Sequence, residues 1–297
     1  MNGTITSLLN AVVQKTGAQN RYTQTSANLA VNGFLFSAKF TVPASYTGKW
    51  DFLKEIYVNI TKRIGSGNGG AVALCSNVSL YDILSYSDYV AGVSMSSSVF
   101  TEGEEVRIAG YADIGYFSMT SRDALEVTVN VGSKSTMPSS DVSLEISAVF
   151  NQVMKTQYKC YQSAKATGAD QPYKNVLSIY YIGAGLNADV VVNDEIGTKA
   201  VNVNSAIDMS NAIGRFEFFT DFGEVYHDQF GLSQDCSMRV PNTNNPSVLI
   251  VTYSFYPEET VNSLTETIVQ RNALVEKIKN NEPDKYQYLK AIGAISA

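Results

Sequence analysis

The dominant pattern along this chain is an alternation of apolar and polar residues, which is typical of β-strands. In residues 34–42, FLFSAKFTV, nearly every second side chain is a large apolar one, and Pro43 follows. Similar short segments recur between Gly, Ser and Asn residues, which favours a sandwich or a barrel. The predicted strands are 34–42, 56–60, 71–74, 90–96, 106–109, 116–119, 125–131, 142–150, 176–182, 189–192, 200–203, 216–219, 225–226, 238–240 and 248–255.

Two short helical segments interrupt these strands, at residues 78–84 and 205–212. Each half of the chain therefore has the same order: strands, a short helix, more strands and a closing hairpin. We interpret the halves as two consecutive β-sandwich domains, 34–150 and 151–256. Residues 151–158 contain neither Gly nor Pro, so we expect the domains to pack together rather than swing on a flexible linker.

The N-terminal residues 1–33 are predicted to form an arm with a short amphipathic helix. Thr4 or Thr6 would cap this helix and Gly17 would end it. Its apolar face would carry Ile5, Leu8, Leu9, Val12 and Val13. Because an isolated helix of this length is marginal in water, we expect these residues to contact a neighbouring subunit or a membrane. Docking of the arm on its own sandwich is the alternative.

The C-terminal residues 257–297 show a helical period instead of alternation. Acidic residues follow Pro257, and Lys277 and Lys279 come near the end of the first helical stretch, as the helix dipole favours. Pro283 is predicted to begin a second short helix. We therefore expect a helical extension after the second sandwich.

Composition limits the classes of function. The chain has 297 residues, of which 44% are hydrophobic and 17% charged, with a net charge of −6. This is enough apolar material for a large core, and the mild acidity argues against a nucleic-acid partner, which needs a basic surface. No apolar run of about 18 residues suggests a membrane span, and no basic residue precedes the N-terminal apolar stretch as in a secretory signal. Cys75, Cys160 and Cys236 show no metal-type spacing and are interpreted as reduced thiols.

One motif raises the question of nucleotide binding. Gly183–Ala188, GAGLNA, fits the G-x-G-x-x-A pattern, and Asp208 follows about 20 residues later, where an acidic residue would meet a ribose. However, the pyrophosphate of a dinucleotide must sit at the N-terminus of a helix that begins in the motif. Residues 186–199 include three consecutive valines and Gly197, which make a poor helix. We interpret the motif as a tight turn between strands.

Other candidate chemistry is sparse. His227 is the only histidine, which excludes multi-histidine metal sites, and no nucleophile turn such as G-x-S-x-G accompanies it. The acidic run Glu102–Glu105 is interpreted as a solvated loop rather than a cation site. We therefore expect no catalytic residue, no metal site and no cofactor, and we predict that the protein is not an enzyme.

The chain resembles the double jelly-roll major capsid proteins of tailless icosahedral viruses, including bacteriophages with an internal membrane. The resemblance is carried by the two strand series, by the short helix in each, and by the closing hairpins LEVTVNVGSKSTMPSSDVSLEISAVF and SMRVPNTNNPSVLIVTYSFYP. It implies a mainly β fold: two consecutive eight-stranded jelly-roll β-sandwiches with short inserted helices and helical N- and C-terminal extensions.

The resemblance also implies a function and partners. The protein would be made in the host cytoplasm and would reside in the virion, as a homotrimer that contacts neighbouring trimers. Other capsid proteins, such as a vertex protein, and inner-membrane lipid would be further partners, whereas sequence-specific nucleic acid would not. The alternative is a surface or secreted β-sandwich binding protein of the adhesin or carbohydrate-binding type. The missing signal and the odd number of cysteines weigh against that alternative.

Overall fold

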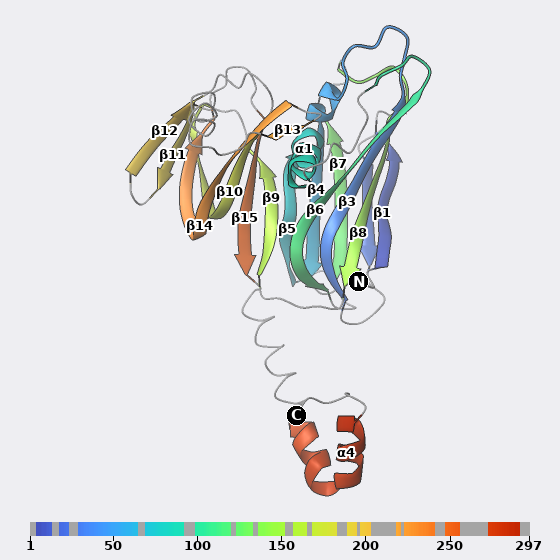
Figure 1. Cartoon of the computed structure of the whole chain (residues 1–297), viewed down its shortest axis with the longest axis vertical. Coiled ribbons are helices and arrows are strands. Elements are labelled where there is room, and N and C mark those ends of the chain that lie inside the picture. The colour runs from blue at the N-terminus through green and yellow to red at the C-terminus, as the bar shows by residue number, and fades with distance from the viewer. Residues whose placement is uncertain are drawn as a thin grey trace. The chain divides into compact units, whose positions relative to one another are not determined.

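The computed structural model divides into two compact units, Met1–Ser254 and Phe255–Ala297 (Figure 1). The residues that it describes are 4–13, 18–23, 29–64, 69–91, 99–119, 123–132, 136–151, 157–164, 168–182, 189–194, 197–202, 218–220, 223–240, 247–255 and 273–291.

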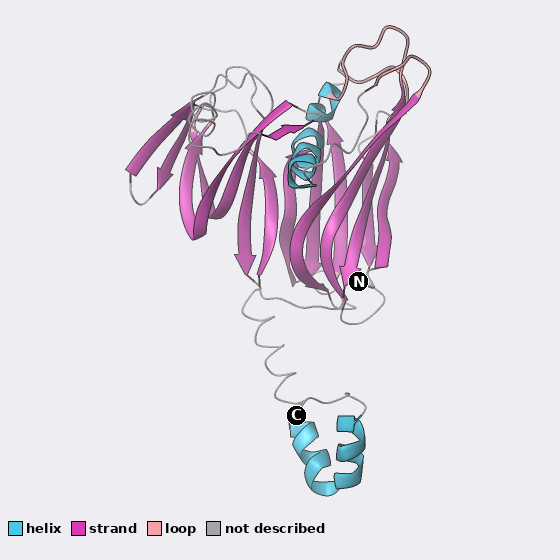
Figure 2. Cartoon of the chain, viewed as in Figure 1, coloured by secondary structure: helices cyan, strands magenta, loops and turns pink. Residues whose placement is uncertain are grey.

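The first unit is mainly β (Figure 2). Its strands are β1 (Thr4–Val12), β2 (Ala18–Thr23), β3 (Leu29–Thr41), β4 (Ile56–Ile64), β5 (Gly69–Ser79), β6 (Glu105–Met119), β7 (Ala124–Val131), β8 (Ser143–Asn151), β9 (Gln157–Ser163), β10 (Asp170–Ile182), β11 (Asp189–Asp194), β12 (Gly197–Asn202), β13 (Phe218–Thr220), β14 (Gly223–Arg239) and β15 (Ser247–Phe255). Two helical elements accompany them, the 3₁₀ helix η1 (Asp51–Glu55) and α1 (Leu80–Ala91).

The first eight strands pair as two four-stranded sheets. One sheet has the order β1-β8-β3-β6 and the other the order β2-β7-β4-β5, and the pairs in both sheets are antiparallel. Strands that are distant in sequence thus lie side by side, and consecutive strands alternate between the sheets except for β4 and β5, which pair with each other. This is the arrangement of an eight-stranded jelly roll, which is built from Greek keys.

Alternate side chains of the two sheets form the core. On β3 the predicted alternation is confirmed: Phe34, Phe36 and Phe40 are buried, whereas Lys39 and Thr41 are exposed. One end of the core is filled by edge-to-face aromatic contacts of Phe40 with Tyr46, Trp50 and Phe52. Aromatic pairs of this geometry add about 0.5–1.5 kcal/mol beyond their buried area, so this end of the sandwich is firmly closed.

Helix α1 fills the connection between β5 and β6. Its residues 80–88 are all buried, as in a helix surrounded by protein. Tyr111 N–H on β6 donates a hydrogen bond to Ser87 Oγ at 2.7 Å. Gly110 allows this approach, because a Cβ there would lie 2.8 Å from Leu84 Cδ2. The helix predicted at 78–84 is thus confirmed from Leu80 onward, whereas residues 78–79 end β5. The strand predicted at 90–96 is wrong at Val90 and Ala91, which end α1.

The predicted N-terminal arm is also wrong. Residues Thr4–Val12 form a strand paired with β8, and β2 pairs with β7, so both belong to the first jelly roll. The register of β1 shifts between Ser7 and Leu9, which is a bulge at Leu8. The bulge lets the adjacent Leu8 and Leu9 both face the core, with 1% and 5% exposure. This broken alternation produces the spacing that suggested a helix.

Most of the other predicted strands are confirmed, with some merged into longer ones. The segments 106–109 and 116–119 are parts of β6, and β14 covers both 225–226 and nearly all of 238–240. Strand β9 was not predicted. The predicted helix at 205–212 lies outside the described residues.

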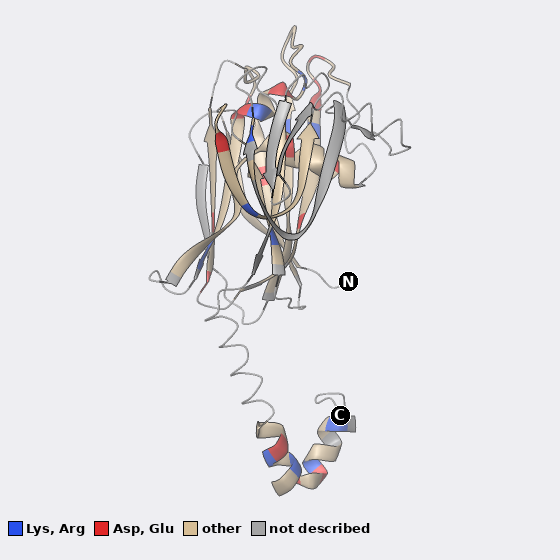
Figure 3. Ribbon diagram, turned by 90° about the vertical axis from the view of Figure 1, so that its left-hand side faces the viewer, with Lys and Arg blue, Asp and Glu red and all other residues tan. Residues whose placement is uncertain are grey.

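The second unit contains a helical stretch over residues 273–281 and α4 (Pro283–Ala291). Helix α4 begins at the proline where the sequence predicts a helix start. The apolar Val275, Ile278, Tyr286 and Leu289 are half-buried, whereas basic and acidic residues are spread over the helices (Figure 3). None of the helices within the described residues combines the length and apolar character that crossing a membrane requires.

Candidate functional site

The glycine motif lies between two strands. Strand β10 ends at Ile182 and β11 begins at Asp189, while Gly183–Ala188 itself is outside the described residues. A dinucleotide fold places a helix directly after its glycines, but β11 is a strand paired with β12 and β14. The prediction of a strand at residues 189–192 is therefore confirmed, and the described segment 189–194 is a strand instead of the helix that a bound pyrophosphate requires.

We predict that NAD, NADP and FAD leave the melting temperature of the protein unchanged, because no helix N-terminus follows the motif. Differential scanning fluorimetry at millimolar ligand tests this. A saturable rise in Tm, as mass action gives when a ligand binds only the folded state, would contradict the prediction.

The other candidate residues are scattered. His227 lies on β14 opposite Tyr180, and its side chain is outside the described part. Glu102 and Glu104 are exposed before β6, and Glu105 forms an exposed ion pair with Lys39 at 3.0 Å. Within the described ranges no three His, Cys, Asp or Glu side chains gather as metal ligands would.

The five apolar residues predicted to contact a partner divide into two groups. Leu8, Leu9 and Val13 are at most 5% exposed in the core of their own subunit. Ile5 is 62% exposed, and Val12 is intermediate. Only Ile5 therefore presents most of its side chain to a partner.

A polar junction forms where β9 meets the first jelly roll. Strand β9 pairs in parallel with β5 at Cys75 and Ser76, and it touches β6 in the antiparallel pair Gly115–Tyr158. The next strand beside it is β15. Because β9 has neighbours in both sheets of the first roll and in the rest of the unit, it joins the two halves of the chain.

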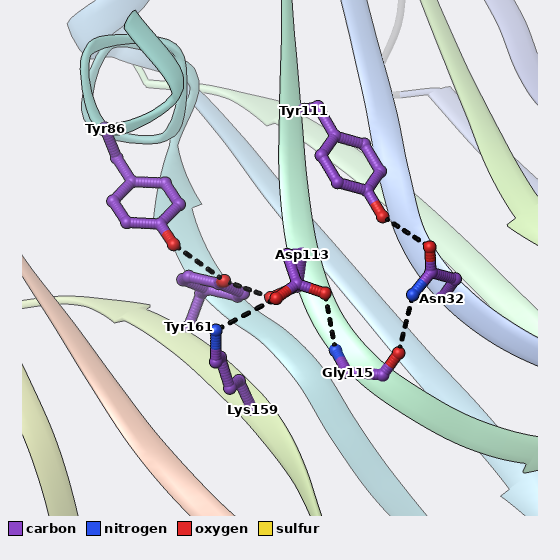
Figure 4. A network of polar contacts seen from close by, with 7 residues as sticks. All are labelled: Asn32, Tyr86, Tyr111, Asp113, Gly115, Lys159 and Tyr161. Carbon is purple, nitrogen blue, oxygen red and sulfur yellow. Dashed lines mark hydrogen bonds and ion pairs between the residues drawn. The ribbon is translucent and has the colours of Figure 1, made fainter. Parts of the chain in front are cut away.

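The centre of this junction is Asp113 on β6 (Figure 4). Gly115 N–H donates to Asp113 Oδ1 at 2.9 Å, and Lys159 Nζ donates to Oδ2 at 3.0 Å. The Tyr161 hydroxyl donates to the Asp113 carbonyl, and Tyr86 Oη of α1 lies 3.3 Å from Tyr161 Oη. One aspartate thus connects β6, β9 and, through a tyrosine pair, α1.

Beside Asp113, a bulge in β3 extends the network (Figure 4). The register with β6 shifts at Asn32, whose Nδ2 donates to Gly115 O at 2.8 Å, while Tyr111 Oη donates to Asn32 Oδ1 at 3.0 Å. Gly33 makes room for the tyrosine, because a Cβ there would lie 2.4 Å from both Tyr111 Oη and Ala112 O. The bulge therefore depends on glycine at this position.

A second cluster surrounds Asp82 on α1, whose exposure is 2%. Ser163 Oγ of β9 donates to Asp82 Oδ2 at 2.5 Å and accepts Ser79 N–H at 2.9 Å. Asp82 Oδ1 has no hydrogen-bond partner. Burial raises the pKa of Asp82 to about 6, against the opposing effects of hydrogen bonds from Ser163 and Ser247 and of the charge on Lys54. The cluster joins α1 to β9 and β15.

A buried ion pair lies inside the first roll. Lys62 Nζ is 3.0 Å from Asp123 Oδ2, and the two side chains are 5% and 4% exposed. The ammonium also lies 4.5 Å from the centroid of the Phe117 ring, as in a cation–π contact. Burial lowers the pKa of Lys62, although Asp123 opposes this effect.

The exposed face of the sheet β1-β8-β3-β6 carries a shallow groove of about 310 Å³. Its lining residues are Asn10, Ser37, Lys39, Arg107, Ser143, Leu144 and Glu145. The groove combines small hydroxyl side chains with charges of both signs and lies on an open sheet surface.

Sequence reasoning missed the junction, although two signals were present. Gly33 and Gly110 directly adjoin the predicted strands 34–42 and 106–109, and a glycine within a strand often marks a bulge or a close approach. Asp82, Ser85 and Asp88 interrupt an apolar helical segment. Buried polar residues of this kind usually have specific partners.

Comparison with known proteins identifies a shared fold. No family model matches the chain, and no curated protein matches it. A chain in the atomic structure of Sulfolobus turreted icosahedral virus matches with a TM-score of 0.50 and 10% identity, over 90% of this chain and 97% of that chain. The crystal structure of the STIV MCP matches with a TM-score of 0.49 and 10% identity, over 85% and 96%. The major capsid protein P2 of bacteriophage PM2 matches with a TM-score of 0.42 and 9% identity, over 86% and 98%.

The first of these matches reaches a TM-score of 0.50 at 10% identity, so it establishes likeness of fold and nothing about function. Together with the strand pairing, it defines this protein as a mainly β protein of the jelly-roll class. The fold that it shares is found in a chain of an icosahedral virus.

Proposed function

We propose that this chain is a major capsid protein that assembles into an icosahedral shell. The observation that carries the proposal is the jelly-roll pairing of the first eight strands, within a fold shared over 90% of the chain with a chain of an icosahedral virus. Within the described residues, the buried Asp82 and the buried pair Lys62–Asp123 contact groups of their own subunit. Such an arrangement suits a subunit that acts through its surfaces.

We further propose that the second half is also a jelly roll, in which β10 and β14 are each two consecutive jelly-roll strands joined without a break. The first part of β10, residues 170–173, pairs with residues 236–239 of β14, and residues 237–239 in turn pair with β11. The last part of β10, residues 178–182, pairs with residues 225–229 of β14 and, on its other side, with β15. The register shifts between the two parts of β10.

If β10 and β14 are each divided into two strands at the register shift between them, the second half forms two four-stranded sheets. One is β9-β15-β10-β14 and the other is β10-β14-β11-β12. They correspond in order and connectivity to β1-β8-β3-β6 and β2-β7-β4-β5 of the first roll. This correspondence supports a double jelly roll with domains near residues 4–151 and 157–255, followed by the C-terminal helices.

The assembly that we propose is a homotrimer that contacts neighbouring trimers. Exposed apolar side chains are available for such contacts, among them Ile5 at 62% and Leu274 at 58% exposure. The C-terminal helices are the segment that we propose to bridge to a neighbouring subunit, to another capsid protein such as a vertex protein, or to inner-membrane lipid. We propose that the protein resides in the virion, where each of these partners would be present.

Native mass spectrometry of the full chain tests the proposed association. We expect a trimer, and we expect Ile5→Ser to weaken it while the Tm of the subunit stays within about 1 °C, because Ile5 is mostly exposed. Thr4→Ser, a smaller change at the neighbouring position of β1, is the matched control and should leave the trimer intact. Monomer alone at all protein and salt concentrations would contradict the proposal.

A further inference from the structure

The seam between the two halves, where α1 meets β9 and β15, contains a buried carboxyl group, that of Asp82, which forms no ion pair with a cation of the described residues. Asp82 on α1 receives its hydrogen bond from Ser163 of β9, and a further one from Ser247, the first residue of β15. Its second oxygen, Oδ1, has no hydrogen-bond partner. An ionised carboxylate in this position loses its hydration and gains only a few hydroxyl donors, so its burial is costly.

The other ionisable groups that act on Asp82 come from the elements around it. Lys54 of η1 favours the charged form through space, but this ammonium is paired with Asp51 at 3.0 Å and lies over the Tyr81 ring. Tyr57 of β4 and Tyr81 of α1 also interact with Asp82, and burial raises the pKa of both phenols. Both tyrosines therefore stay neutral near pH 6.

We propose that protonation of Asp82 acts as a pH-sensitive latch that tightens the seam joining α1 to β9 and β15. Protonation removes the buried charge. It also makes Asp82 a hydrogen-bond donor, whereas the ionised carboxylate only accepts hydrogen bonds from the serine hydroxyls. Mild acid would therefore hold the second half of the subunit more firmly against the first. The latch belongs to the single subunit and does not depend on its assembly into a shell.

The direction of the pH dependence follows from the pKa of Asp82, which burial raises to about 6 from 3.8. Above pH 6 the group is ionised in both the folded and the unfolded chain, and the folded protein carries the cost of the buried charge. Between pH 6 and 4 the folded protein binds the proton first, so its stability rises as the pH falls. A shift of this size corresponds to a roughly 100-fold change in the ratio of folded to unfolded protein.

Urea unfolding of the full chain at pH 8 and pH 4.5 tests the latch. We expect this ratio to increase between the two pH values about 30-fold more for the wild type than for Asp82→Asn, which is always neutral, because the full change is reached only below the pKa of the unfolded chain. Asp141→Asn, which removes an exposed carboxyl group, is the matched control and should behave like the wild type. Equal pH dependence of the wild type and Asp82→Asn would overturn the proposal.

A second measurement does not require Asp82→Asn to fold. Ser163→Ala removes a donor that stabilises the ionised form, so the midpoint of the acid-induced stabilisation should move to higher pH. Hydrogen exchange of β9 and β15 amides, corrected for the intrinsic pH dependence, should show the added protection at this seam in the wild type. An unchanged midpoint, or protection that does not increase at the seam, would overturn the proposal.

Discussion

Replacing Gly33 with alanine should lower the free energy of unfolding by about 3 kcal/mol, as expected when an added group has no room. A Cβ at this position would lie 2.4 Å from the backbone oxygen of Ala112 and 2.4 Å from Tyr111 Oη. The tyrosine could move, but its hydroxyl would then lose Asn32. The carbonyl could move only if the pairing of β3 with β6 changed. Chemical denaturation of the purified variant measures this loss.

Gly70→Ala is the matched control for this prediction. Gly70 lies on β5, and a Cβ there would meet nothing within 4 Å, so the substitution should change the stability by at most about 1 kcal/mol, and in the stabilising direction. If Gly33→Ala were as stable as Gly70→Ala, the bulge at Asn32 would not have the geometry described here, and Asp113 would not be the centre of a rigid junction.

The second large effect is expected at the buried ion pair. Lys62→Met should cost about 3–5 kcal/mol, because it removes the cation that faces the buried carboxylate of Asp123. Arg63→Met is the control on the same strand: Arg63 pairs with Glu126 at 2.7 Å but is 47% exposed, and exposed pairs contribute at most about 1 kcal/mol. Denaturant titrations of both variants give the comparison.

The double variant Lys62→Met with Asp123→Leu separates burial of a charge from loss of packing. Replacing both partners by apolar side chains of similar size is often neutral or stabilising, so the double variant should recover most of the stability that Lys62→Met loses. A double variant that is less stable than Lys62→Met would contradict this explanation and would assign the effect to packing around Phe117.

Much of the fold was predictable because alternation is a local property. On β3 the apolar side of FLFSAKFTV faces the core as predicted, and the helical turn before residue 84 belongs to α1. The N-terminus could not be interpreted in this way, because the bulge at Leu8 places adjacent leucines in the core. The pattern 5, 8, 9, 12, 13 has the spacing of a helix face, and only the pairing with β8 decides between the two structures.

The junction was not predictable, because it depends on contacts between distant segments. Lys159 and Asp113 are 46 residues apart, and Ser163 and Asp82 are 81 apart. No local spacing indicates that one strand, β9, pairs with β5 and also touches β6. The glycines indicate a bulge or a close approach at these positions, and the buried polar residues indicate specific hydrogen bonds, but neither identifies the partner.

Electron microscopy of the purified full chain tests the central claim most directly, because the proposed homotrimer of double jelly-roll subunits requires a threefold outline. We predict particles with threefold symmetry and six similar lobes, two from each subunit, which associate into closed shells when they are concentrated. Particles that remain two-lobed monomers at every concentration, or that form open filaments without threefold units, would contradict the account.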